Sequence, residues 1–161
     1  MINSFTGRYF KTKQILTWVL QDSILVELKK VTNKDYHFLY DILREREPIT
    51  NISHKKIPTY KQHVQFIMSK PYSKWYIVYY RGKKSGSAYL SKQNEIGIFL
   101  KKGIQNKGIG NMVLQLLMKN NPRPRYLANI NPKNSKSINF FKKNGFHLIQ
   151  YTYEFNTDSI E

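Results

Sequence analysis

Three short runs rich in β-branched and aromatic residues follow one another in the middle of the chain, with only a few residues between them. Residues 75–80 read Trp-Tyr-Ile-Val-Tyr-Tyr, residues 87–90 form the second run, and residues 95–100 read Glu-Ile-Gly-Ile-Phe-Leu. Such compositions are typical of strands. Connections this short cannot hold the crossover that parallel neighbours need. The three runs therefore predict an antiparallel meander, and the rest of the fold must attach to it.

Further strand and helix patterns flank this meander. In the second half of the chain strand, helix, strand, helix and strand follow one another, which requires at least one parallel crossover. We therefore expect an α/β fold with a mixed, mostly antiparallel central sheet and helices on both faces. The flanking elements predicted from periodicity are a short helix at 15–20, a strand at 24–31, helices at 34–46 and 60–69, a helix from Gly110 to about 120, a strand at 125–130, a helix at 134–144 and a strand at 146–155.

The length and apolar content fit one compact domain. The chain has 161 residues, of which 40% are hydrophobic, and no repeat or Gly/Pro/Ser-rich linker divides it. We expect an N-terminal extension at 1–22, a single domain at 23–156 and a short tail at 157–161. The polar N-terminus resembles no signal peptide, and no run reaches the ~18 apolar residues of a membrane span. We expect a cytoplasmic protein with no membrane partner.

The charge balance is strongly basic. Lysine and arginine total 27 against 10 acidic residues, which gives a formal net charge of +17. This predicts an anionic partner, such as nucleic acid, a membrane surface or a phosphate-bearing molecule, without choosing among them. An AT-rich genome would also enrich lysine. The absence of cysteine excludes a thiol nucleophile and a cysteine-ligated metal, and no other metal-ligand spacing is present.

The segment Gln105 to Gly110, Gln-Asn-Lys-Gly-Ile-Gly, lies between a predicted strand and a predicted helix. Its glycines stand where the chain must turn tightly. Free backbone N–H groups at the start of a helix bind phosphate groups, and glycine lets the anion approach closely. Lys107 adds a positive charge. The segment predicts a phosphate site, although a turn with two glycines before a helix also occurs for structural reasons alone.

A second motif lies downstream, where Asn131 to Ser137 opens a predicted helix that closes at Gly145-Phe146. Together the two motifs resemble the GNAT superfamily of acyl-CoA-dependent N-acetyltransferases. In that family a strand leads into a Q/R-x-x-G-x-G/A turn and a helix, and a later helix opens with N-x-x-A/S and closes with Gly-Phe. The resemblance runs from about Glu95 to Phe155 and implies the GNAT fold, acetyl-CoA as cofactor and acetyl transfer to a primary amine.

The resemblance also implies a cofactor site. The backbone of 100–102 would pair with the pantetheine arm, the turn 105–110 would hold the pyrophosphate, and Asn134 with Ser137 would lie beside the thiol end. Asn134 is also a good helix N-cap without any ligand. The residues assigned to cofactor binding are Phe99, Leu100, Lys102, Gln105, Asn106, Lys107, Gly108, Ile109, Gly110, Asn134, Ser137 and Phe141.

Acetyl transfer to an amine needs a neutral nucleophile, a donor to the thioester carbonyl oxygen and a proton for the departing thiolate. The resemblance places the donor at the N–H of Phe99 or Leu100. Glu95 is the best candidate base, with a surface carboxylate paired to a lysine as the alternative reading. Many family members carry a tyrosine where this chain has Phe141, which cannot donate a proton. Tyr151 and Tyr153, on the last predicted strand, are the possible substitutes, although tyrosines in such positions more often serve strand packing.

The acceptor site is expected in the loop between the first two long helices. Its candidate residues are Glu47, Asn51, His54 and Lys55, whereas His63, on an apolar helical stripe, is expected to be packed in the interior. Residues 52–67 resemble acetyltransferases that modify nucleotide-linked amino sugars, and the Asn-x-x-Ser-Ile form of the second motif resembles ribosomal-protein acetyltransferases. A basic RNA-binding domain and a non-catalytic acyl-CoA-binding member stay as alternatives, although nucleic acid is not the expected partner. A homodimer is left open.

Overall fold

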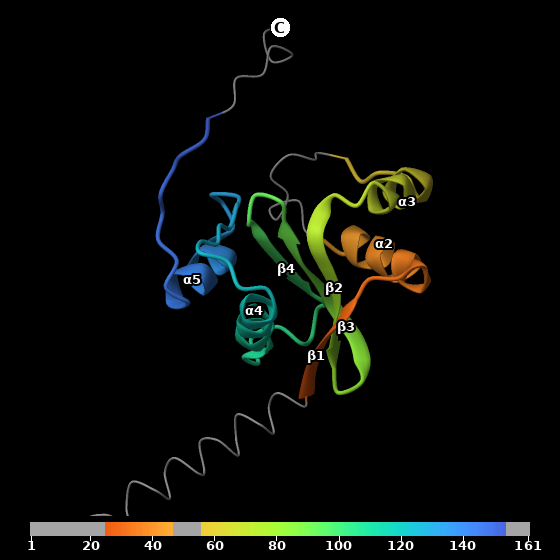
Figure 1. Cartoon of the computed structure of the whole chain (residues 1–161), viewed down its shortest axis with the longest axis horizontal. Coiled ribbons are helices and arrows are strands. Elements are labelled where there is room, and N and C mark those ends of the chain that lie inside the picture. The colour runs from red at the N-terminus through yellow and green to blue at the C-terminus, as the bar shows by residue number, and fades with distance from the viewer. Residues whose placement is uncertain (1–24, 47–55, 154–161) are drawn as a thin grey trace, which may run out of the picture.

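The computed structural model describes residues 25–46 and 56–153. In these ranges the chain forms a four-stranded sheet in the order β1-β2-β3-β4, with every neighbouring pair antiparallel (Figure 1). The strands are β1 (Val26–Lys30), β2 (Tyr72–Tyr80), β3 (Lys83–Ser91) and β4 (Ile96–Leu100). The predicted meander is therefore confirmed. The helix expected at 15–20, the extension at 1–22 and the tail at 157–161 lie outside the described residues.

Helices cover both faces of the sheet, as the sequence predicts. In Figure 1, α2 and α3 lie on one side of the strands, and α4 and α5 lie on the other. After a short 3-10 turn, η1 (Asn33–Asp35), the helices are α2 (Tyr36–Arg44), α3 (Tyr60–Met68), α4 (Ile109–Asn120) and α5 (Ser135–Lys143). The architecture is an α/β fold with three layers.

Each face of the sheet has its own hydrophobic core. On the α4 side, the apolar stripe of α4 packs against alternate residues of the strands, including Val78, Ala88 and Ile96. On the α2/α3 side, Leu39 and Ile42 of α2 pack with side chains of α3 and β2. Because side chains of a strand alternate between faces, Gly97 and Phe99 of β4 face α2 and α3.

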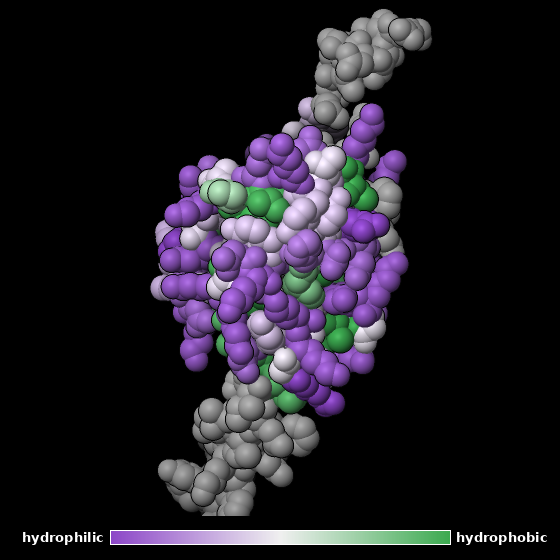
Figure 2. Space-filling view, turned by 90° about the vertical axis from the view of Figure 1, so that its right-hand side faces the viewer, coloured by the Kyte–Doolittle hydropathy of each residue, from purple (hydrophilic) through white to green (hydrophobic). Residues whose placement is uncertain are grey.

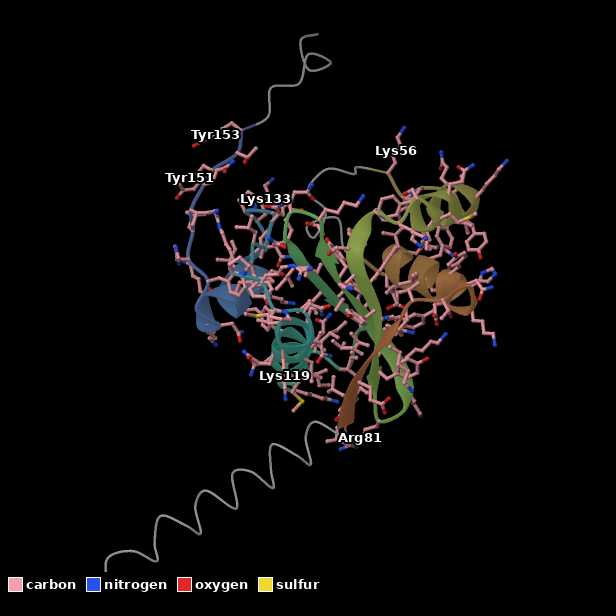
Figure 3. All side chains as sticks on the ribbon, in the orientation of Figure 1. Lys56, Arg81, Lys119, Lys133, Tyr151 and Tyr153 are labelled. Atoms are coloured by element: carbon pink, nitrogen blue, oxygen red, sulfur yellow. The ribbon has the colours of Figure 1, made fainter. Side chains whose placement is uncertain are left out.

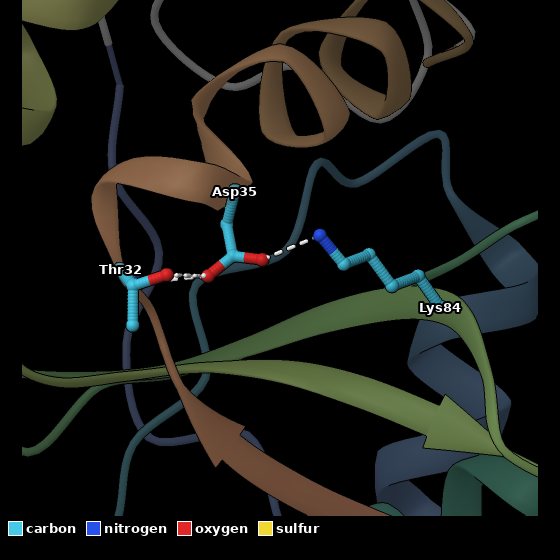
Figure 4. Close-up of polar contacts among 3 residues, drawn as sticks. All are labelled: Thr32, Asp35 and Lys84. Atoms are coloured by element: carbon cyan, nitrogen blue, oxygen red, sulfur yellow. Dashed lines mark hydrogen bonds and ion pairs between the residues drawn. The ribbon is translucent and has the colours of Figure 1, made fainter.

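Asp35 connects the start of α2 to β3 (Figure 4). Its Oδ2 accepts hydrogen bonds from the N–H and the hydroxyl of Thr32, at 2.8 and 2.7 Å, and its Oδ1 lies 2.6 Å from Nζ of Lys84. Burial opposes ionisation, but the hydrogen bonds from Lys84 and Thr32 outweigh it and hold the pKa of Asp35 below its ordinary value. The ionised carboxylate thus ties the helix layer to the sheet.

Two strand predictions were wrong. The segment predicted as a strand at 125–130 makes one isolated parallel bridge, between Glu95 and Leu127. Of this segment, Leu127 alone forms backbone hydrogen bonds with the start of β4: its N–H donates to Asn94, and its carbonyl oxygen accepts from Ile96. Residues 146–153 form no strand. Their alternating pattern favours a strand, but a strand needs a neighbour to pair with, and no described strand lies beside them.

Candidate active site

The turn before α4 presents a row of unpaired backbone donors. Among the described residues, the N–H groups of 105–110 have no hydrogen-bond partner. Asn106 (φ +63°) and Gly108 (φ +74°) adopt left-handed conformations, which turn successive N–H groups toward one side, and Gly108 is the N-cap of α4. A Cβ added at Gly108 would meet nothing within 4 Å, so the space there is open. These residues fit a pyrophosphate, because α4 adds the positive end of its dipole.

The turn is attached to the last strand of the sheet. The side-chain Nε2 of Gln105 donates to the carbonyl oxygen of Leu100 at 2.9 Å. Among the basic residues near this strand end, Lys101 forms an ion pair with Glu45 at 3.6 Å, and Lys107 is exposed. Gln105 therefore holds the row of donors at the end of β4.

Beside this turn, no strand of the described residues pairs with the outer edge of β4, which we call the free edge. The N–H of Ile96 donates to Leu127 on the outer side, and Lys101 N–H donates to Ser85 on the β3 side. Since backbone groups alternate along an antiparallel strand, the N–H groups of Ile98 and Leu100 point outward. The N–H of Phe99 points into the ladder with Ser87. The sequence suggested the N–H of Phe99 or of Leu100 as the donor to the thioester carbonyl oxygen. Of these two groups, only the N–H of Leu100 faces the free edge.

Helix α5 packs beside α4 in the core on the α4 side of the sheet. The side chain of Asn134 accepts a hydrogen bond from Ser137 N–H at 3.1 Å, so the capping role expected for Asn134 is confirmed. Phe141 belongs to that core. The residue is 8% exposed, and its ring lies edge-on to Phe140 and Phe146 in the α4-side core. Phe140, which the sequence did not indicate, instead approaches the first turn of α4 near Gly110.

Glu95 immediately precedes β4. Its Oε1 accepts a hydrogen bond from Nδ2 of Asn129 at 2.7 Å. The ion pairs in the described ranges involve other carboxylates, so no described lysine neutralises Glu95. By strand alternation its side chain shares the α2/α3 face with Gly97 and Phe99. The arrangement provides a carboxylate at the start of β4.

The α2/α3 face of β4 carries an aromatic cluster that the sequence did not reveal. Tyr72 and Tyr89 are stacked with ring centroids 3.8 Å apart and an interplanar angle of 9°. A Cβ at Gly97 would lie 2.1 Å from the Tyr89 ring, so only glycine leaves room for that ring. Arg46 lies over Phe99, with its guanidinium carbon 5.2 Å from the ring centroid. Burial raises the pKa of Tyr72, which keeps its hydroxyl protonated.

A cavity opens next to Tyr72. It has a volume of about 640 Å³ and lies between the end of α3, the end of β1 and the start of β2. Three lysines, Lys30, Lys70 and Lys74, and several aromatic rings line it, but no aspartate or glutamate does. The surrounding surface on this side is mainly hydrophilic, with separate hydrophobic patches (Figure 2).

His63 is buried, as expected from its place on an apolar stripe. The residue is 4% exposed, and its ring lies 5.6 Å from that of Tyr40. Its Nε2 has no hydrogen-bond partner among the described residues. Burial, and secondarily the charge of Arg46, lower the pKa of His63 below its ordinary value of 6.5. The ring is therefore neutral at neutral pH.

This shift predicts a stability change in weak acid. Below about pH 6.5 the unfolded chain takes up a proton at His63 that the folded chain does not, so the free energy of unfolding falls as pH decreases. The thermal midpoint of the wild type should drop by up to a few degrees more than that of His63→Gln between pH 7.5 and 5.5. Equal drops, measured by circular dichroism, would contradict a buried neutral His63.

The remaining predicted residues are not brought to this site. Tyr151 and Tyr153 lie on the segment that runs away from α5, and they are 74% and 90% exposed (Figure 3). Neither contacts Glu95 in the structure. The acceptor-loop candidates Glu47, Asn51, His54 and Lys55 lie outside the described residues.

Comparison with known proteins places this geometry in a family. The family model of the GNAT acetyltransferases matches residues 36–146, whereas no curated protein matches the chain. Similar solved structures include a domain from Methanocaldococcus jannaschii DSM 2661 (TM-score 0.71, 24% identity, 80% of this chain and 92% of that chain).

Two further structures share the fold at lower identity. One is RimL, a ribosomal L7/L12 α-N-protein acetyltransferase in complex with coenzyme A (TM-score 0.64, 16% identity, 78% of this chain and 82% of that chain). Another is the microcin C7 self-immunity acetyltransferase MccE in complex with acetyl-CoA and AMP (TM-score 0.56, 17% identity, 75% of this chain and 78% of that chain).

Within the described ranges, no helix has the length and apolar character needed to cross a membrane. The free edge of β4 and the row of donors before α4 lie inside the segment that the family model matches. The chain therefore belongs to the GNAT acetyltransferase family, and it is an N-acetyltransferase whose acetyl donor is acetyl-CoA.

Proposed function

We propose that this enzyme acetylates the primary amine of an amino sugar linked to a nucleotide. The observation that carries the proposal is the cavity beside Tyr72, which combines three lysines and several aromatic rings without any acidic residue. Lysines attract the phosphates of a nucleotide, and aromatic rings stack on bases and sugars. The structure of MccE with AMP supports a nucleotide beside the acetyl donor in this fold.

The distribution of charge supports a small anionic acceptor over a nucleic acid. Basic side chains are spread around the molecule, and Lys56, Arg81, Lys119 and Lys133 project from different sides (Figure 3). Nucleic-acid binding proteins instead collect such residues in one stripe or patch. The net charge of +17 attracts anions generally, and the cavity provides the selective contacts.

Different backbone groups of the enzyme bind different parts of the acetyl donor. Acetyl-CoA, when bound, supplies an activated thioester. The N–H groups of 105–110 bind its pyrophosphate. The outward N–H groups of Ile98 and Leu100 orient the rest of the acetyl-CoA molecule along the free edge of β4. The Leu100 N–H is the candidate donor to the carbonyl oxygen where negative charge develops.

On the acceptor side, we assign Glu95 as the base that takes a proton from the incoming amine. Asn129 fixes one carboxylate oxygen, which leaves the other to face the acceptor. We expect Glu95→Gln to lower kcat by about 100-fold or more, with an unchanged KM for acetyl-CoA. Glu27→Gln removes an exposed carboxylate on β1 and is the matched control. An active Glu95→Gln with wild-type kcat would exclude this role.

Competition among acceptors tests the substrate class. Steady-state release of the coenzyme A thiol is measured with a UDP-linked amino sugar, the free amino sugar and a peptide with a free N-terminus. The proposal requires the highest kcat/KM for the nucleotide-linked sugar. If the peptide reacts fastest, the enzyme is instead a protein N-terminal acetyltransferase, a reading that the fold shared with RimL favours.

A further inference from the structure

The ring of Tyr89 lies across β4 at Gly97. The two residues are direct partners in the antiparallel pairing of β3 with β4. A Cβ built on Gly97 would overlap the far end of the Tyr89 ring, with the hydroxyl oxygen 2.5 Å away. Only a glycine leaves room for this ring. The hydroxyl end of Tyr89 therefore reaches over the last strand of the sheet.

Neighbouring aromatic rings hold Tyr89 in this position. Tyr72 of β2 stacks on it with ring centroids 3.8 Å apart and an interplanar angle of 9°. Trp75 packs edge-on against Tyr72 at 4.8 Å, and its indole N–H donates to Oγ of Ser87 at 2.9 Å. Tyr89 and Gly97 are both only partly buried, so a ligand can reach them. The stack forms a fixed wall over an accessible part of β4.

The free edge of β4 ends beside the same glycine. Leu127 accepts the N–H of Ile96 there, so the first outward N–H without a partner among the described residues is that of Ile98. The turn proposed to bind the pyrophosphate follows the other end of the strand, after Leu100. An acyl-CoA that extends from this turn along the free edge therefore brings its acyl group to Gly97 and Ile98, where Leu127 closes the edge.

We infer that the Tyr89 ring makes the enzyme select acetyl-CoA over donors with longer acyl chains. The inference rests on the placement of acetyl-CoA along β4 in the proposed function. An acetyl group at Gly97 ends beside the ring, whereas each further methylene group needs volume that the ring already fills. Closely packed side chains yield little to an added methylene group. The stack on Tyr72 opposes any movement of the ring, so longer chains are excluded by shape.

Calorimetric titrations with coenzyme A, acetyl-CoA and butyryl-CoA test the inference without any acceptor. The wild type should bind butyryl-CoA about 10–100-fold more weakly than acetyl-CoA. Tyr89→Ala and Tyr89→Leu both remove the part of the ring that lies over Gly97, so each should bind the two acyl-CoA molecules about equally. Tyr89→Phe keeps the ring and should discriminate as the wild type does.

Tyr79→Ala is the matched control. Tyr79 packs on the same face of the sheet as Tyr89, in the α2/α3-side core, and lies near the opposite end of β2 from Tyr72. Its replacement removes a ring of the same size away from Gly97, so the preference for acetyl-CoA should stay. Coenzyme A carries no acyl group and should bind every variant with wild-type affinity, which shows that each is folded.

Two results would overturn the inference: a wild type that binds acetyl-CoA and butyryl-CoA equally, or a preference for acetyl-CoA that survives in Tyr89→Ala and Tyr89→Leu. Neither result depends on the acceptor. If the preference depends on Tyr89 but no nucleotide-linked amino sugar is acetylated, the limit on chain length stands and the proposed acceptor is wrong. If such sugars are acetylated while the preference does not depend on Tyr89, the acceptor stands and the limit is wrong.

Discussion

Gly86→Ala is expected to prevent folding or to lower the thermal midpoint by about 10 °C or more. A Cβ at Gly86 would lie 2.2 Å from the carbonyl oxygen of Phe99 and 3.0 Å from the Cα of Leu100. These are backbone atoms of β4, so no rotamer change relieves the clash and the two strands must separate. A cost of about 4 kcal/mol or more is among the largest for one substitution, and each kcal/mol corresponds to about 2–4 °C at this size.

Gly82→Ala is the matched control for this effect. Gly82 lies in the turn between β2 and β3 with φ +74°, and an added Cβ would meet nothing within 4 Å. Alanine at this position lowers the free energy of unfolding only by the strain of its left-handed backbone, about 1–2 kcal/mol. Thermal melts of both variants make the comparison. Similar midpoints for the two would show that β3 and β4 are not packed as described.

Gly108→Glu is expected to weaken acetyl-CoA binding by at least about 100-fold. The substitution adds a side chain and a negative charge to the open space before the N–H groups of 105–110. A carboxylate there competes with the pyrophosphate for these donors and repels it. Isothermal titration calorimetry measures the loss, and kcat at saturating acetyl-CoA should change far less than kcat/KM.

The control for Gly108→Glu again uses Gly82. Both glycines have φ +74° and open space around an added Cβ, so Gly82→Glu adds the same strain and the same charge away from the turn. Gly82→Glu should bind acetyl-CoA as the wild type does. If both variants lose affinity alike, the effect comes from net charge or stability, and the turn is not the pyrophosphate site.

The sequence predicted the elements whose signals are local. The strands of the meander and the helices that follow Thr59 and Gly108 depend on composition, caps and periodicity within one segment. The tight turn before α4 was also predictable, because its glycines stand between a strand and a helix. The row of N–H groups at 105–110 is a direct consequence of that arrangement.

The aromatic cluster on the α2/α3 face of β4 could not be predicted, because it depends on contacts between distant segments. Nothing near Arg46 in sequence indicates that its guanidinium lies over Phe99, and Tyr72 stacks on Tyr89 through strand pairing. Only Gly97 carried a signal, since a glycine inside a strand indicates a close approach, here by the Tyr89 ring. The final predicted strand, at 146–155, had a local pattern but no neighbour in the described structure.

A thermal melt shows whether the turn before α4 and the free edge of β4 hold acetyl-CoA. Wild-type protein is heated with and without millimolar acetyl-CoA. A ligand that binds only the native state raises the midpoint, by an amount equivalent to about 2.7 kcal/mol at 100 times Kd. The midpoint of the wild type should rise clearly, and that of Gly108→Glu should not. A folded wild type whose midpoint does not move would contradict this placement of acetyl-CoA.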